Sequence, residues 1–284
     1  MPTILALIDG SVYSHSVCDH AAWAASRTGA AVELMHVLGR RSVSAAAPDF
    51  SSHLDAESRD RLLAELAAHD EEAGKLAQRR ARAILDAAKA RLDADGIAEV
   101  ITRLRQGDLV EALVEMEGTT NLVVVGKRGE AADFARLHLG SNLERIARTS
   151  RHPVLVASRA FKPIDSVVIA FDGGPSAIKA VAHIAEGSLL RGLSLRLLMV
   201  GSPSAQAGAK LDESLARLRA AGYQAAAGVL PGQPDEVIAD VVRQGGADLL
   251  VMGAYGHSRI RTLIIGSTTT EMIRSCMIPV LLYR

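Results

Sequence analysis

The sequence predicts a doubly wound parallel α/β fold that occurs twice, as two tandem five-stranded domains. Short aliphatic runs alternate with amphipathic helical patterns, and such runs are typical of strands buried on both faces of a parallel sheet. The same order of patterns and a similar glycine-rich stretch occur in each half of the chain. The alternation predicts right-handed crossovers that bury both sheet faces, and the recurrence predicts an internal repeat.

Each copy opens with a strand, a helix and a second strand. The first strands, TILALIDGS and SVVIAFDGG, lead into Asp-Gly pairs at Asp9 and Asp172. The helical patterns that follow are expected to stop at Gly29 and Gly192, because glycine can end a helix in the left-handed conformation. The aliphatic runs AVELMHVL and LSLRLLMV then complete a βαβ unit in each copy.

Three further strands complete each copy. A weaker strand (AEVITRLRQG; QAAAGVLPG) and a helix precede a strong strand (NLVVVG; DLLVMG), which leads into the glycine-rich stretch. A helix and a last strand (PVLVAS; PVLLYR) follow. The segment RAFKPID joins the copies, and its proline marks a natural boundary, so we predict domains at residues 1–160 and 161–284.

The two copies differ mainly in the middle. From the first Asp-Gly pair to the glycine-rich stretch is 117 positions in the first copy and 81 in the second, a difference of 36. The additional residues fall at about 52–96, where apolar residues recur three and four apart among Ala, Arg and Glu. We predict a long helix or a helical hairpin there, bent near Gly74, that covers the sheet or a partner subunit.

Composition argues against several classes of function. Lys plus Arg and Asp plus Glu are each 32, so no net charge attracts nucleic acid or an anionic membrane, and aromatics at 3% leave few rings for base stacking. Cys18 and Cys276 are too few for a disulfide framework or a zinc site. No apolar run reaches the ~18 residues of a membrane helix, and the start MPTILALIDG lacks the features of a leader peptide. We therefore expect a cytoplasmic protein without nucleic-acid or membrane partners.

The strand ends contain the candidate binding residues. In an open parallel sheet the ligand crevice lies beyond the carboxyl ends of the strands, where the winding reverses. In the second copy, Gly253, Gly256 and Gly266 would let main-chain N–H groups approach an anion. Ser267 and Thr268 then begin a predicted helix whose N-terminus favours phosphate. An architectural alternative stays open, in which the glycines only form turns and the first-strand aspartates cap helices.

The first copy has a similar but not identical stretch. Ten residues, rather than nine, separate Gly129 from Gly140, and Lys127 and Arg128 lie in the loop, where they could pair with phosphates. The sequence contains no Walker motif, no dinucleotide fingerprint, no nucleophile elbow and no H-E-x-x-H motif. We therefore assign no catalytic residue and no metal-binding side chain.

Together these motifs resemble the universal stress protein family: an Asp after the first strand, G-x-x-G-x9-G-[ST] after the fourth, and PVLV as the last strand. The second copy matches the ATP-binding form of the glycine motif letter for letter through Gly253, Gly256, Gly266 and Ser267. The resemblance implies an adenine nucleotide alpha hydrolase-like fold that binds ATP, with Mg²⁺ at the phosphates, mainly in the second copy. The ATP-binding residues that it implies are Asp172, Val200 through its main chain, Gly253, Gly256, Gly266, Ser267 and Thr268. The corresponding residues of the first copy are Asp9, Val37, Gly126, Gly129, Gly140 and Ser141.

The resemblance also implies how the copies are arranged and what the chain does. Family members pair through their last strands, which would make this chain an intramolecular pseudo-dimer. The implied function is a stress-response binding protein whose partner contacts depend on ATP, rather than an enzyme. Two alternatives stay open: slow ATP hydrolysis or phosphotransfer, and a nucleotide-free scaffold that recruits a partner through the long helix. A homodimer of the tandem chain and an unidentified regulatory protein are the further partners that we expect.

Overall fold

The computed structural model of the 284-residue chain describes residues 2–39, 56–127, 141–253 and 276–284. The described strands are β1 (Thr3–Leu7), β2 (Ala31–Leu38), β3 (Val100–Gln106), β4 (Thr120–Gly126), β5 (Val154–Ala157), β6 (Ser166–Ala170), β7 (Ser194–Val200), β8 (Gln224–Leu230), β9 (Leu249–Gly253) and β10 (Val280–Tyr283). The described helices are α1 (Ser14–Thr28), α2 (Ala56–Ala94), α3 (Leu109–Met116), α4 (Ser141–Thr149), α5 (Pro175–Glu186), α6 (Ala205–Ala220) and α7 (Pro234–Arg243).

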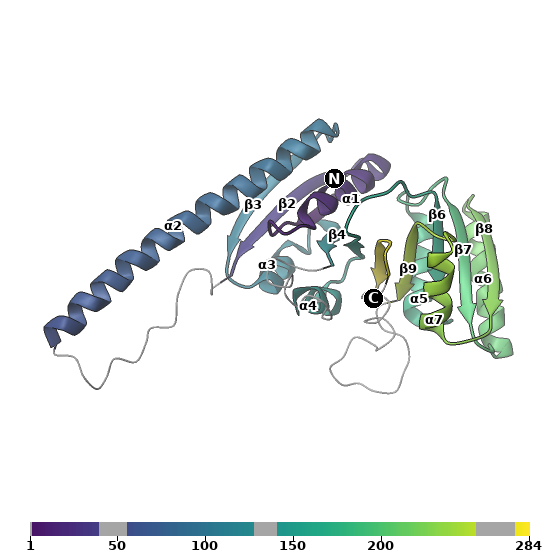
Figure 1. The fold of residues 1–284 in the computed structure, drawn as a ribbon. Helices are drawn as coiled ribbons and strands as arrows, with labels where there is room; N and C mark the ends of the chain where they lie inside the picture. Colours follow the sequence, from purple (N-terminus) through teal and green to yellow (C-terminus); the bar gives the residue numbers. More distant parts are fainter. Residues whose placement is uncertain (1, 40–55, 128–140, 254–275) are drawn as a thin grey trace.

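The strands form one ten-stranded sheet in the order β3-β2-β1-β4-β5-β10-β9-β6-β7-β8 (Figure 1). Copy 1 comprises β1 to β5 and copy 2 comprises β6 to β10. Within each copy all neighbouring strands are parallel, and the strand order of copy 2 mirrors that of copy 1. The predicted fold class, with five parallel strands in each of two tandem copies, is therefore confirmed.

The two copies meet at a seam, which is the antiparallel pairing of β5 with β10. In its register Leu281 lies opposite Leu155, and both residues are 0% exposed. The predicted intramolecular pseudo-dimer through the last strands is thus the arrangement in the structure. The connection between β5 and β6 spans residues 158–165. The domain boundary between residues 160 and 161 lies in this connection and stays a prediction.

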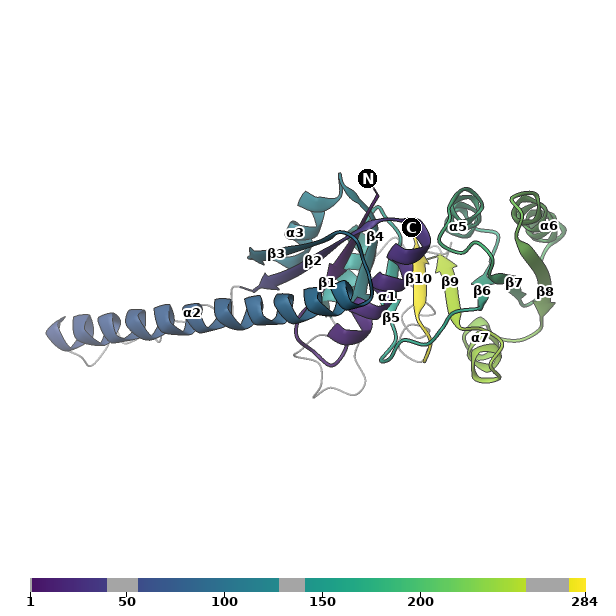
Figure 2. The same cartoon turned by 90° about the horizontal axis from the view of Figure 1, so that it is seen from above.

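Helices cover both faces of the sheet (Figure 2). Helices α1, α2, α5 and α6 pack on one face, and α3, α4 and α7 pack on the other. The apolar core on each face contains residues from both copies, so each core continues across the seam. This continuity means that the copies share their buried surface instead of enclosing two separate cores.

Glycines end the first helix of each copy at different places. Helix α1 ends at Gly29, whose φ of 67° lies in the left-handed region, as the sequence predicts. Helix α5 was expected to continue to Gly192 but ends at Gly187. The Gly187 N–H donates to the carbonyl oxygens of His183 and Ile184 there, and residues 188–193 form turns before β7. The expected end at Gly192 is therefore wrong by about one and a half helical turns.

The additional residues of copy 1 form a single helix, α2, and not a hairpin. Its 39 residues run without interruption through Gly74, and α2 extends beyond the edge of the sheet in both views (Figures 1 and 2). Among the side chains that the structure describes, the buried ones of α2 lie in its C-terminal part, at Ala81, Leu85, Ala88 and Leu92, and they anchor that part to the sheet. The corresponding helix of copy 2, α6, has 16 residues. Along the described ranges, no helix combines the length and apolar character needed to cross a bilayer.

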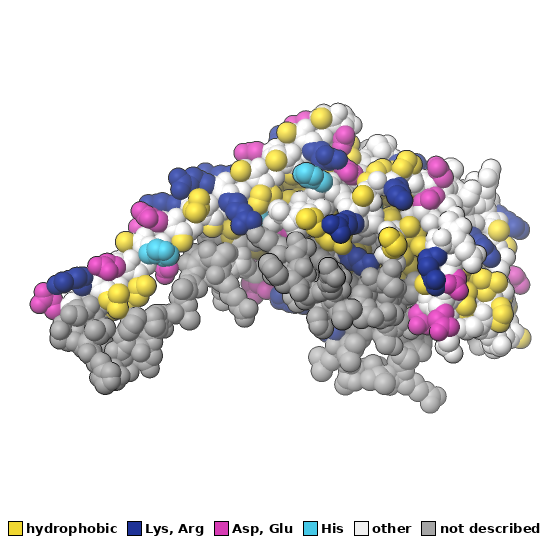
Figure 3. Space-filling view, viewed as in Figure 1, with side chains coloured by type: hydrophobic (Ala, Val, Ile, Leu, Met, Phe, Trp, Pro, Cys, Tyr) yellow, Lys and Arg dark blue, Asp and Glu magenta, His cyan; other side chains and the backbone are white. Residues whose placement is uncertain are grey.

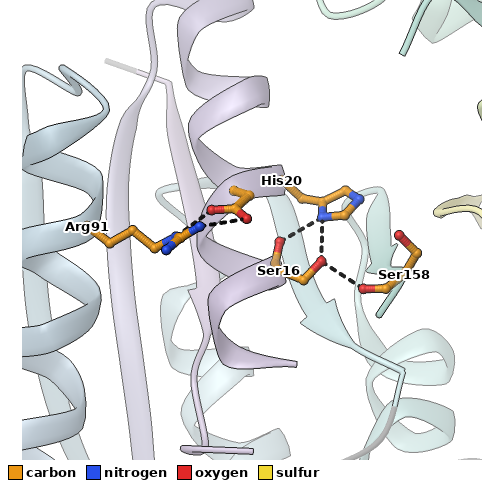
Figure 4. A network of polar contacts seen from close by, with 5 residues as sticks. Ser16, His20, Arg91 and Ser158 are labelled. Atoms are coloured by element: carbon orange, nitrogen blue, oxygen red, sulfur yellow. Dashed lines mark hydrogen bonds and ion pairs between the residues drawn. The ribbon is translucent and has the colours of Figure 1, made fainter. Parts of the chain in front are cut away.

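A buried polar network joins α1 to the connection between the copies (Figure 4). Ser16 Oγ donates to the Ser158 carbonyl oxygen (2.7 Å), and His20 Nδ1 lies 2.7 Å from the Ser16 carbonyl oxygen. Since a carbonyl can only accept, Nδ1 must carry the proton. His20 is 0% exposed, its Nε2 has no hydrogen-bond partner, and its ring packs edge-on against Phe161. Burial therefore lowers the pKa of His20 below its ordinary value of 6.5.

Candidate functional site

The register of copy 2 places three of the predicted residues at one edge of the sheet. Ala170, the last residue of β6, pairs with Leu198 on β7 and with Met252 on β9. Asp172 follows two residues later, at the level where β7 ends at Val200 and β9 ends at Gly253. The carboxyl ends of three adjacent strands therefore bring Asp172, Val200 and Gly253 together at the point where the winding reverses.

Asp172 lies in a short loop that leads directly into α5. Its Oδ1 accepts a hydrogen bond from the Gly174 N–H (2.8 Å), and its side chain is exposed at the end of the sheet. Gly173 has a φ of 72°, a conformation that strains residues with a side chain. Pro175 then occupies the first turn of α5. This loop holds the carboxylate beside the N-terminus of α5, the positive end of the helix dipole.

Gly253 packs directly against that helix. A Cβ built on Gly253 would lie 2.9 Å from the Ser176 Cβ, which is closer than side-chain atoms approach one another. Ser176 belongs to the first turn of α5, so the end of β9 and the start of α5 are in contact only because position 253 has no side chain. The end of β9 therefore lies against a helix N-terminus, and helix N-termini favour anionic groups.

A cation that the sequence analysis missed lies at the same loop. Lys210 on α6 donates through Nζ to the Gly173 carbonyl oxygen (3.0 Å), and its aliphatic stem covers the glycine. In copy 1 the corresponding loop glycine, Gly10, contacts Ile84 of α2 instead, and a Cβ on Gly10 would lie 2.7 Å from the Ile84 Cδ1. Both residues stand twelve positions before the glycine that follows their helix, and this spacing is a signal that could have paired them.

The aspartate of copy 1 is more fully engaged than that of copy 2. Asp9 Oδ1 accepts from the Ser11 N–H (2.9 Å) and from Ser14 Oγ (3.3 Å), and Ser14 Oγ in turn accepts from the Gly10 N–H (2.9 Å). Copy 2 has Ala177 at the position of Ser14, so the corresponding hydroxyl is missing there. In copy 1 the hydrogen bonds of Asp9 are thus made within its own loop and with Ser14 at the start of α1. Such local bonds are expected for an aspartate with an architectural role.

The neighbouring strand of copy 1 also differs. Val37 lies on β2 at the level of Asp9, as its register predicts, since Met35 pairs with Leu7. Its neighbour His36 is buried and bonds through Nδ1 to the Ile8 carbonyl oxygen (2.7 Å). Lys127, which the sequence suggested as a phosphate ligand, donates through Nζ to the Cys276 carbonyl oxygen of copy 2 (2.7 Å). Its contact therefore bridges the two copies.

Most of the predicted phosphate-binding residues lie outside the described residues. This applies to Gly256, Gly266, Ser267 and Thr268 of copy 2 and to Gly129 and Gly140 of copy 1. Gly126 ends β4 beside β1, and Ser141 begins α4, whose first turn also contains Glu144. The backbone around the glycine motif of copy 1 is thus described at both ends, and a helix does begin where the motif predicts one.

The cysteines are not poised for nucleophilic chemistry. Cys18 and Cys276 are buried, and burial raises the pKa of the Cys18 thiol to about 12 and also raises that of Cys276. Both thiols are therefore protonated at neutral pH, and a protonated thiol is a poor nucleophile. Over the residues that the structure describes, no group of three or more His, Cys, Asp and Glu side chains could hold a metal ion.

Comparison with known proteins gives the family. The model of the universal stress protein family matches residues 1–158 and, separately, 163–284. A universal stress protein of Synechocystis sp. is 36% identical over 287 aligned positions, which cover 100% of both chains. A universal stress protein structure from Archaeoglobus fulgidus shares the fold over 99% of this chain and 97% of its own, with a TM-score of 0.69 and 21% identity.

A third similar protein is a universal stress protein that was solved in complex with cAMP. It is 27% identical, covers 43% of this chain and 98% of its own, and has a TM-score of 0.37. The two family-model matches, together with full-length similarity above 30% identity, are decisive. The chain belongs to the universal stress protein family, with one family match in each half.

Proposed function

We propose that this universal stress protein binds ATP, with Mg²⁺ at the phosphates, in copy 2, and acts in the cytoplasm as a nucleotide-dependent regulatory binding protein. The observation that carries the proposal is the close contact between Gly253 and Ser176. A Cβ at position 253 would collide with the Ser176 Cβ in the first turn of α5, so the end of β9 meets this helix N-terminus directly beside the exposed carboxylate of Asp172. The residues present therefore fit an anionic ligand at the ends of β6 and β9.

Each residue has a distinct role in this proposal. The Asp172 carboxylate accepts hydrogen bonds from ribose hydroxyls, and the main chain of Val200 lies beside adenine. Main-chain N–H groups at Gly253, Gly256 and Gly266 surround the phosphates, and Ser267 and Thr268 add hydroxyl donors and the N-terminus of a helix. The Mg²⁺ ion would neutralise part of the phosphate charge.

Differences around the two aspartates support the choice of copy 2. Asp9 is bonded by a serine side chain and lies beside Ile84, whereas Asp172 has a single main-chain donor on Oδ1 and lies beside Lys210. A lysine next to the loop favours an anionic ligand, and an isoleucine does not. The sequence motif also matches the nine-residue spacing only in copy 2.

Equilibrium dialysis with labelled ATP and Mg²⁺ tests the proposal. Wild type should bind one equivalent, and Gly266→Val should lose at least about tenfold in affinity, or about 1.4 kcal/mol, because the side chain enters the phosphate cradle. Gly140→Val makes the same change in copy 1 and should bind like wild type. Equal affinity for wild type and Gly266→Val would reject the site, and a loss in Gly140→Val alone would move the site to copy 1.

The same samples separate binding from catalysis. A binding protein should release phosphate from ATP at the same background rate as Asp172→Ala. Phosphate release clearly above that background would favour the enzyme hypothesis, in which a positioned cation stabilises charge on the phosphates. Absence of ATP binding in both copies would leave the scaffold hypothesis.

A further inference from the structure

Helix α2 has a second apolar stripe that the core does not use. The inner stripe, which contains Leu85 and Leu92, faces the sheet. The outer stripe recurs with alternating spacings of four and three residues along almost the whole helix, and it consists of Leu62, Leu66, His69, Ala73, Leu76, Arg80, Ala83, Ala87, Ala90 and Ala94. This spacing averages 3.5 residues, which is the period of a seam between two paired helices.

The outer stripe is accessible along the anchored half of the helix. Ala83, Ala87, Ala90 and Ala94 are all exposed, although the same turns bury Leu85 and Leu92 on the opposite side. Further towards the N-terminus, Leu76 is 61% exposed. Apolar side chains lie among charged ones along the exposed length of α2 (Figure 3). A large apolar residue and a row of alanines on one open face allow a second helix to approach closely.

We propose that α2 pairs antiparallel with α2 of a second copy of this chain. One register places Leu62 opposite Ala87 of the partner subunit and Leu66 opposite Ala83 of the partner subunit. The same register places Ala73 opposite Leu76 of the partner subunit. Every leucine of the outer stripe then faces an alanine, so that large and small side chains interdigitate without voids.

Charge favours the antiparallel direction over the parallel one. Asp70, Glu71 and Glu72 form an acidic segment, and Arg79 and Arg80 form a basic segment less than two turns further along. The antiparallel register sets each acidic segment against the basic segment of the partner helix. A parallel pair in register would instead set acidic residues against acidic residues and leucines against leucines, which is unfavourable on both counts.

Two polar layers, related by the symmetry of the pair, fix this alignment. His69 lies opposite Arg80 of the partner subunit, between the leucine–alanine layers, and polar residues at such positions specify register. The helix is long enough for the interaction, since 39 residues span ~58 Å. The corresponding helix of copy 2 has only 16 residues, so the outer stripe in its full length belongs to copy 1.

Sedimentation equilibrium on the full chain tests the pairing. Wild type should form a dimer at micromolar concentration, and Ala83→Glu should weaken it at least about tenfold, because the substitution buries a charge opposite Leu66 of the partner subunit. Ala68→Glu is the matched control, since Ala68 is exposed on the same helix but off the outer stripe. A wild type that stays monomeric, or equal weakening by both substitutions, would overturn the proposal.

Exchanging the leucine and the alanine of one layer tests the register of the pair. Leu66→Ala leaves a gap and Ala83→Leu overfills the same layer, so each should weaken the dimer, whereas the double variant restores one leucine and one alanine per layer. Recovery of wild-type affinity in the double variant is the expected result, and additive weakening would overturn the register.

A charge reversal gives a second test of the register. Glu65 and Asp86 of the partner subunit lie near each other in this register, so Glu65→Lys should strengthen the dimer. ATP affinity should stay unchanged in all these variants, which separates this proposal from the nucleotide site.

Discussion

The two copies share one backbone plan but differ in what surrounds the first-strand aspartate. In copy 1, Ser14 bonds Asp9 and Ile84 packs on the adjacent glycine, so the loop is closed by its own side chains. In copy 2, Asp172 is exposed and Lys210 is bonded to the loop carbonyl. Residues outside the recurring motif, on the helices after the first and second strands, therefore set the chemistry of each copy.

The copies are nevertheless one structural unit, and the seam offers the strongest way to test this. Leu155→Ala should lower the free energy of unfolding by about 3 kcal/mol, because Leu155 is 0% exposed and loses both transfer energy and packing against β10. Urea denaturation followed by circular dichroism measures the loss. Unfolding should remain a single transition, since the cores on both faces cross the seam.

Val114→Ala on α3 is the control for that experiment. Val114 is 49% exposed, so its truncation should cost less than about 0.5 kcal/mol. Two separate unfolding transitions in wild type, or equal losses in the two variants, would mean that the copies do not depend on each other through the seam.

The next largest expected effect is on ATP affinity, when the first-strand aspartates are replaced. Asp172→Ala should weaken ATP binding at least about tenfold, or about 1.4 kcal/mol, because it removes the proposed ribose acceptor. Asp9→Ala should leave ATP affinity unchanged and lower stability instead, since Asp9 bonds Ser11 and Ser14. Isothermal titration with ATP and thermal unfolding of both variants distinguish the two roles. A loss of affinity in Asp9→Ala would show that copy 1 also binds nucleotide.

The regular part of this fold could be predicted because the strands are aliphatic runs with clear ends. β2 occupies residues 31–38, the same residues as the predicted run, and β7 lies within its predicted run. The end of α5 could not be predicted in the same way, because Gly187 and Gly192 are equally able to end a helix and the choice depends on how residues 188–193 turn back towards β7.

The candidate site was predictable to the extent that it follows from strand order. Asp172, Val200 and Gly253 end neighbouring strands, so a parallel sheet must bring them to one edge. Lys210 and Ile84 were not predictable from the motif, because their position depends on how α6 and α2 pack over the sheet. Packing register between a helix and a sheet is a tertiary property, which local patterns do not determine.

Two histidines at corresponding positions should differ in their effect on stability at acid pH. His20 is 0% exposed and burial lowers its pKa. Burial against its neighbours also lowers the pKa of His183, but that residue is exposed and packs on Tyr283, so solvent screens the shift. Well above pH 6.5 His20 is neutral in both the folded and the unfolded chain, so stability does not depend on its titration there. As the pH falls below 6.5, the unfolded chain takes up the proton first, so the folded protein loses stability until the lower pKa is passed.

The expected loss is about 1.4 kcal/mol for each unit by which the folded pKa lies below the unfolded one. His20→Asn keeps a donor near the position of Nδ1 but does not titrate, so it should flatten the decline in unfolding free energy between pH 7 and pH 5. His183→Asn is the matched change in copy 2 and should flatten the decline less, because His183 is exposed and solvent screens its pKa shift. Equal slopes for wild type and His20→Asn would assign the acid sensitivity to other groups.

The smallest expected effects concern helices α3 and α7, which occupy corresponding positions after β3 and β8. Asp108 caps α3 by accepting from the Val110 and Glu111 N–H groups, and Arg145 lowers the pKa of this carboxyl. Gln233 precedes α7 without a side-chain hydrogen bond to the helix. Asp108→Ala should therefore cost about 1 kcal/mol of stability.

The reciprocal change in copy 2 isolates the cap from the rest of copy 1. Gln233→Asp should gain a few tenths to about 1 kcal/mol, because a short acceptor at the N-cap satisfies free N–H groups and faces the positive end of the helix dipole. Gln233→Asn supplies the acceptor without the charge and should gain less. Chemical denaturation at pH 7 and at pH 3 measures both contributions, because an aspartate cap is ionised and effective at pH 7 and loses its advantage over asparagine as the carboxyl becomes protonated. If the two variants are equally stable at pH 7, the interaction with the helix dipole contributes nothing at this position.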